Sequence, residues 1–170
     1  MLAYFGMMAA YNDWANRRLY DACAHLEDDD LRAGLGAFFG SLHGTLNHML
    51  VADRIWMARF LGEPTPDVQL DSILHEGFND LRKARERQDA EIAGFVGDLD
   101  EGALLREVDY TTMVRPGNVR QPLWAALAHV FNHQTHHRGQ CHAMLTRVAM
   151  EAPSFDLIQF QRDTGHGLSV

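Results

Sequence analysis

The sequence predicts an all-α protein built as a four-helix bundle, with a long crossover connection before its last helix. Apolar residues recur at spacings of three and four along nearly all of the 170 residues, which is the pattern of helices with one buried face. Glycines, prolines and an acidic run break this pattern in a few places and leave four long segments. A chain of this length can bury a core, and we expect residues 1–170 to form one domain.

The first two helices are expected in the N-terminal third of the chain. Apolar positions between residues 5 and 26 predict a helix of about six turns, and an acidic run at residues 27–30 interrupts it. Ser41 is a suitable N-cap for a second helix over residues 42–61, because its hydroxyl can accept a hydrogen bond from the first turn. Gly62 and the prolines beyond it end this helix.

The third helix is defined by its possible caps and by its charge. Asp71 or Ser72 is expected to cap a helix that continues to Val96. Its charged middle, including residues 82–87, is expected to form a solvated face.

The crossover and the last helix follow. Residues 107–119 are rich in β-branched and aromatic side chains and contain a turn signal at residues 115–118, which predicts a short β-hairpin. Residues 123–148 return to helical spacing, with Pro122 near the first turn. The apolar patch at residues 155–160 either packs back on the bundle or forms an interface.

Composition excludes several classes of function. Lys and Arg number 15 against 23 Asp and Glu, a net charge of −8, whereas a nucleic-acid or anionic-membrane binder needs a basic face. No apolar run approaches the roughly 18 residues of a membrane span. Cys23 and Cys141 make no disulfide framework, so a cytoplasmic location is expected.

Histidines are concentrated on the fourth helix. His129, His133, His137 and Cys141 follow one another at intervals of four, which places them in one slowly turning row flanked by apolar residues. Burying several imidazoles without partners is costly, and a metal ion is one economical solution, because imidazole ligates Zn²⁺, Ni²⁺, Cu²⁺ or Fe²⁺. Spacing alone leaves open which pair would bind, since His133 and His136 are also suitably spaced.

A third ligand is available on the second helix. His48 shares an apolar face there and could complete a site with two histidines of the fourth helix. Three protein ligands leave coordination positions for water or substrate, which is typical of catalytic rather than structural metal sites. The alternative for each histidine is a packing role in the core.

Three polar residues on apolar stripes also require explanation. Asn12 and Asn16 would either orient a metal ligand or join a buried polar network. Asp53 points about 140° away from His48 around the helix, so it is not expected to bind the same ion. A buried pair with Arg17 or Arg18 is the expected role of Asp53.

Four segments together resemble the DinB-like (DinB/YfiT) family of metalloenzymes. They are HVFNHQTHHRGQ at residues 129–140, LNHMLVADRIW at 46–56, YNDWANRRL at 11–19 and DLIQF at 156–160. The resemblance covers essentially the whole chain in the right order. It implies a four-helix bundle, usually a homodimer, that holds a divalent metal with three histidines.

The resemblance also assigns the ligands. Carried over by position, they are His48, His133 and His137, with Zn²⁺ or Ni²⁺ as the expected ion and Fe²⁺ or Mn²⁺ as alternatives. His129 then becomes a neighbour in the pocket and His136 does not face the metal. Cys141 extends the histidine row as a further ligand, a reactive thiol or a core residue. Arg138 would bind a substrate carboxylate or form a surface pair.

The family includes thiol S-transferases that activate a small thiol such as bacillithiol, and a mycothiol-dependent maleylpyruvate isomerase. The resemblance therefore implies a metal-dependent thiol transferase acting on a small-molecule substrate, with no nucleic-acid or membrane partner. The alternatives are a non-catalytic metal-binding stress-response dimer and a metal-dependent hydrolase, although no acidic residue is evidently placed as a base for hydrolysis.

Overall fold

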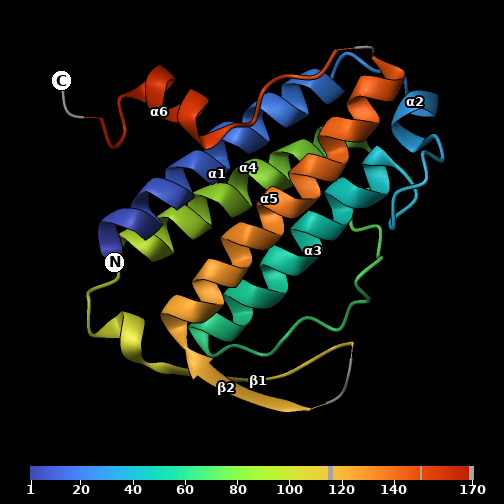
Figure 1. The fold of residues 1–170 in the computed structure, drawn as a ribbon. Coiled ribbons are helices and arrows are strands. Elements are labelled where there is room, and N and C mark those ends of the chain that lie inside the picture. Colours follow the sequence, from blue (N-terminus) through green and yellow to red (C-terminus); the bar gives the residue numbers. More distant parts are fainter. Residues whose placement is uncertain (115–116, 150, 169–170) are drawn as a thin grey trace.

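A computed structural model describes residues 1–114, 117–149 and 151–168. Four long helices form a bundle (Figure 1): α1 (Leu2–Cys23), α3 (Leu42–Leu61), α4 (Phe78–Gly97) and α5 (Leu123–Val148). Helices α1 and α3 each pack against both α4 and α5, so α1 and α3 occupy opposite corners. The predicted all-α bundle is confirmed, and its long connection precedes α5, the last helix of the bundle.

Local signals set the limits of α3 as predicted. The Ser41 hydroxyl accepts a hydrogen bond from the backbone N–H of Gly44 at 3.1 Å, which caps the first turn. Gly62 ends the helix in the left-handed conformation, with φ of 71°, which glycine adopts without steric cost. These two caps fix the length of the helix that carries His48.

The start of α4 differs from the prediction. The helix begins at Phe78, and Asp71 and Ser72 lie in the preceding loop. Asn47 on α3 holds that loop, because its Oδ1 accepts the backbone N–H of Leu74 at 2.9 Å and of His75 at 3.0 Å. These N–H groups donate to a side chain of α3, so they do not form the hydrogen bonds of a helical turn.

Two short helices were not anticipated. The acidic run expected only as an interruption forms most of α2 (Asp28–Arg32), whose first turn holds three aspartates that favour a helix N-terminus. In the tail, α6 (Leu157–Thr164) packs on α1. Its Phe160 is 1% exposed and contacts the rings of Tyr11 and Trp14 edge-on, so the apolar tail packs back on the bundle.

The crossover contains a short 3₁₀ helix, η1 (Ala103–Leu105), and the predicted hairpin of strands β1 (Glu107–Thr111) and β2 (Asn118–Pro122). The strands are antiparallel, and Tyr110 faces Val119 across the pair. Of the predicted turn, residues 115 and 116 lie outside the described residues. The hairpin crosses the end of the bundle and contacts α3 and α5 (Figure 1). Within the described ranges, no helix combines the length and apolar character that a membrane span requires.

A buried ion cluster lies in the middle of the bundle and corrects two expectations. Arg85, expected on a solvated face, is 1% exposed. Its Nη1 lies 2.7 Å from Asp53 Oδ2 and its Nη2 lies 2.9 Å from Asp89 Oδ1. Asp53 therefore has a buried arginine partner, as predicted, but the partner comes from α4 rather than from α1. The predicted Arg17 instead pairs with Asp13.

Asparagines of α1 complete this cluster. The Nδ2 groups of Asn12 and Asn16 donate to Asp89 Oδ1 at 2.9 and 3.0 Å. Arg138 of α5 donates to Asn12 Oδ1 at 2.6 Å and is itself 1% exposed. The two asparagines thus belong to a buried polar network, and Arg138 joins that network instead of forming a surface pair.

Candidate metal centre

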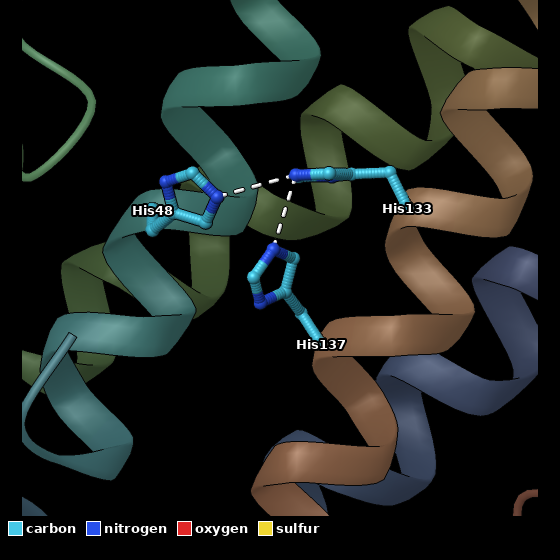
Figure 2. A group of neighbouring side chains, drawn as sticks. All are labelled: His48, His133 and His137. Atoms are coloured by element: carbon cyan, nitrogen blue, oxygen red, sulfur yellow. Dashed lines mark hydrogen bonds between the residues drawn. The ribbon is translucent and has the colours of Figure 1, made fainter. Parts of the chain in front are cut away.

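Three histidines from two helices converge in the bundle. His48 lies on α3, and His133 and His137 lie one turn apart on α5 (Figure 2). The Nε2 of His133 is 3.3 Å from the Nε2 of His48 and 3.0 Å from the Nε2 of His137. One ligand atom from each of the three lies within 4.8 Å of the others. The structure thus brings together the three residues that the resemblance names.

The outer nitrogens of two rings fix their orientation. The Nδ1–H of His48 donates to the carbonyl oxygen of Leu70 at 2.8 Å. The Nδ1–H of His137 donates to Gln140 Oε1 at 2.8 Å. In a neutral imidazole the proton on Nδ1 leaves a lone pair on Nε2, so both rings aim an acceptor at the centre of the triad.

The donor set fits a divalent metal ion. Two nitrogens bound to one tetrahedral ion at about 2.0–2.1 Å stand about 3.3 Å apart. The two shortest Nε2 separations, 3.0 and 3.3 Å, are close to this value. Because lone pairs that meet at one point repel unless a proton or a cation lies between them, we conclude that the three histidines are placed where they could hold a metal.

Burial keeps these rings neutral, which is the form that binds metal. Loss of water contact, reinforced by repulsion among the neighbouring imidazolium groups, lowers the pKa of His133 to about 3. The same loss of water lowers the pKa of His137 to about 4 and lowers the pKa of His48. At neutral pH a metal would therefore meet little competition from protons.

One side of the triad is covered by Phe39. Its ring stacks on His48 with centroids 3.7 Å apart and meets the edge of His137 at 5.6 Å. The loop that carries Phe39 approaches the first turn of α3 so closely that a Cβ at Gly44 would overlap the carbonyl oxygen of Phe39. A glycine at this position thus allows the loop to lie against the helix.

The other side of the triad opens on a cavity of about 370 Å³. His48 and His133 line it, together with His129, whose exposed ring lies 5.0 Å from that of Trp56. His129 is thus a pocket neighbour, as expected. A second hollow, of about 460 Å³, lies beside Tyr11 and shares no lining residue with the triad.

Two other members of the histidine-rich segment lie away from the triad. Cys141 is fully buried among apolar side chains, and burial raises the pKa of its thiol well above the usual value. His136 is exposed, and its Nε2 lies 3.2 Å from Gln140 Nε2, so it contacts the residue that orients His137. Neither belongs to the group of residues that could hold a metal.

The buried ion cluster joins the two helices that carry the triad. Gln134, the residue after His133, donates through Nε2 to Asp53 Oδ2 at 2.6 Å and to the carbonyl of Met49 at 3.4 Å. Met49 in turn follows His48. The cluster therefore fixes α5 against α3 directly beside the ligand positions.

Sequence reasoning did not identify several of these supporting residues. Gln140 had a detectable signal, since it follows His137 by three positions on the same helical face. Phe39 and Leu70 come from loops, where the sequence carries no periodicity that would place them beside a histidine.

Comparison with known proteins agrees with this geometry. The sequence model of the DinB family matches residues 1–167. The chain belongs to the DinB family. Protein DinB of Bacillus subtilis (strain 168) is 25% identical over 154 residues, which cover 86% of this chain and 87% of that protein.

A solved DinB-like structure shares the fold. The crystal structure of a DinB-like protein from Bacillus cereus ATCC 10987 matches with a TM-score of 0.64 and 18% identity, over 85% of this chain and 91% of that chain. The family resemblance found in the four sequence segments is confirmed.

Proposed function

We propose that this DinB-family chain binds one divalent metal ion through His48, His133 and His137, and that the ion is catalytic. The observation that carries the proposal is the open side of the triad, which faces a cavity large enough for a small molecule. Three protein ligands leave room for one more, as in catalytic rather than structural sites. The set of nitrogen donors suits Zn²⁺ or Ni²⁺, with Fe²⁺ and Mn²⁺ as alternatives.

The reaction we propose is transfer of a low-molecular-weight thiol to a small electrophile. A bound divalent metal lowers the pKa of a thiol and so supplies a thiolate near neutral pH. The chain contributes the rest: Phe39 shields one face of the triad, and His129 and Trp56 form the wall against which a substrate packs. A cytoplasmic homodimer without nucleic-acid or membrane partners belongs to the same proposal.

Hydrolysis has less support from the residues around the site. The described residues that line the cavity include no aspartate or glutamate to serve as a base for water. The carboxylate of Asp53 is turned toward Arg85 at 2.7 Å.

The test is a screen for thiol-dependent turnover. Protein purified without a nickel column is loaded with Zn²⁺ or Ni²⁺ and mixed with glutathione, bacillithiol, mycothiol or coenzyme A and a chromogenic aryl chloride. Thiolate attack forms the carbon–sulfur bond and releases chloride. We expect at least one thiol to react faster with loaded protein than with chelator-treated protein, and the His133→Ala variant to lose the difference.

A matched control is His25→Ala, which changes an exposed histidine that neither belongs to the triad nor lines the cavity. It should react as the wild type does. If no thiol reacts faster with loaded protein, the transferase proposal is wrong. A large rise in stability on metal binding without any turnover would instead support the non-catalytic metal-binding dimer.

A further inference from the structure

The cavity beside the triad extends along α3 to a second polar group, the guanidinium of Arg59. His48 and Arg59 are 11 positions apart (59 − 48), which is about three turns, so they share one face of the helix. Their Cα atoms are separated by a rise of about 16 Å. Ala52 and Ile55 lie between them on this face, and all four residues line the cavity.

Arg59 is held by aromatic rings rather than by an acid. Its guanidinium carbon lies 4.6 Å from the ring centroid of Trp56 and 4.5 Å from that of Tyr110. Nη2 donates to the carbonyl of Thr111 at 2.9 Å, which fixes the direction of the planar group. The buried Nε has no hydrogen-bond partner within the part of the chain that the structure describes.

No described carboxylate compensates this charge. Asp109 and Glu63 border a neighbouring hollow on which Arg59 also lies, yet neither comes within ion-pair distance of it. Asp109 pairs instead with Arg120 at 2.7 Å, and Glu63 is exposed. Partial burial lowers the pKa of Arg59 from its ordinary value. Arg59 is therefore an oriented, partly dehydrated cation that lacks an anion.

The rest of the cavity is suited to an apolar body. Away from Arg59 and the histidines, most of its walls are apolar or aromatic side chains: Ala52, Ile55, Trp56, Leu70, Met113 and Val114. Its volume of about 370 Å³ lies within the range of about 300–1,000 Å³ for small-molecule sites. A ligand that fills it would therefore be apolar in the middle and polar at its two ends.

We infer that the cavity takes a small organic anion, whose carboxylate pairs with Arg59, whose apolar body packs against Trp56, and whose metal-binding atom lies at the histidine triad. A carboxylate matches the N–H donors of a guanidinium in one plane, and the pair is stronger in a site from which water is partly excluded. The inference rests on the proposed function, because the triad end of the ligand needs the metal.

The test uses two thiols of the same shape that differ in charge. They are para-(mercaptomethyl)benzoate and its neutral analogue para-(mercaptomethyl)benzamide. Each is titrated into Co²⁺-loaded protein, and the dissociation constant is taken from the absorption band that a thiolate gives when it binds Co²⁺. We expect the benzoate to bind wild type about tenfold or more tightly than the benzamide, as a charge-assisted hydrogen bond predicts.

Variants assign the preference to Arg59. Arg59→Met is expected to bind the two thiols with equal affinity while it retains Co²⁺, and Arg59→Lys, which keeps the charge, is expected to retain part of the preference. Arg54→Met is the matched control, because Arg54 lies on the same helix but does not line the cavity. It should keep the full preference.

The outcomes separate this inference from the proposed function. Equal affinities in wild type, a preference that survives in Arg59→Met, or no change in the Co²⁺ spectrum with either thiol would each overturn the carboxylate subsite while leaving the metal site intact. If wild type does not bind Co²⁺, the proposed function fails. In that case the two thiols are titrated into chelator-treated wild type and Arg59→Met, and binding is followed by tryptophan fluorescence. A preference for the benzoate in wild type that Arg59→Met lacks would still assign the selection of the anion to Arg59, and no such preference would overturn it.

Discussion

Replacing Arg85 with methionine should destabilise the bundle strongly, because the change leaves two buried carboxylates without their cation. Asp53 and Asp89 lie 2.7 and 2.9 Å from the guanidinium, and none of the three side chains is more than 2% exposed. Removing one partner of such a buried pair costs about 3–5 kcal/mol. This is a large part of the roughly 5–15 kcal/mol that holds a typical domain folded.

The predicted loss depends on pH. Burial already raises the pKa of Asp89 to about 6 in the intact protein, and removing Arg85 raises it further. A carboxyl with a raised pKa takes up a proton more readily when folded than when unfolded, so low pH favours the folded state of the variant. We therefore expect the gap between Arg85→Met and wild type to be about 3–5 kcal/mol at pH 7 and smaller at pH 5.

Urea unfolding followed by circular dichroism measures this gap. The control is Arg82→Met, one turn earlier on the same helix, whose ion pairs with Asp21 and Glu86 are solvent-exposed. Exposed pairs contribute about 0–1 kcal/mol, so the control should stay close to wild type. If the free energy of unfolding of Arg85→Met falls by less than about 1 kcal/mol, or by no more than that of the control, the buried ion cluster does not stabilise the bundle.

Three further outcomes follow from the site. Gln140→Leu should weaken metal binding about 10–100-fold, because it removes the acceptor for His137 Nδ1–H. Gln140→Glu keeps an acceptor oxygen and should bind metal as wild type does. Competition with a fluorescent chelator measures the affinity of both variants. Gly44→Ala should displace Phe39 from His48, because the added Cβ would overlap the carbonyl oxygen of Phe39. We expect a lower melting temperature and weaker metal binding. If both values stay unchanged, the stacking of Phe39 on His48 does not support the metal site. Chelator-treated protein should lose stability as the pH falls from about 6.5 toward 4, because histidines whose pKa is lowered by folding bind protons mainly when unfolded. The melting temperature measures this loss, and a constant value over this pH range would contradict a neutral, buried triad.

Features set by neighbouring residues were predictable from the sequence. The caps of α3 at Ser41 and Gly62 act within one turn of the residues they terminate, so local chemistry was sufficient. The period of α5 placed His133 and His137 on one face for the same reason. Cys141 continues the same spacing, but each step of four turns about 40° around the helix, and the thiol reaches the apolar core instead.

Features set by distant partners were not predictable from local signals. The start of α4 depends on Asn47, which belongs to a different helix and binds the backbone of the preceding loop. Arg85 looks like one more charge in a solvated run until Asp53 of α3 and Asp89 of its own helix are seen beside it. The apolar face of the second helix made His48 a candidate third ligand, and the family resemblance selected it, but only the packing of α3 on α5 brings its ring to the triad.

A chain in which His48, His133 and His137 hold one divalent metal should retain one ion per molecule, and metal stoichiometry measures this number. Wild type, His133→Ala and the control His25→Ala are purified without a nickel column, exposed to Zn²⁺, desalted and analysed by inductively coupled plasma mass spectrometry. We expect one tightly bound ion per chain in wild type and control, and none in His133→Ala. Equal metal in all three proteins, or none in wild type, would contradict a metal site at these three histidines.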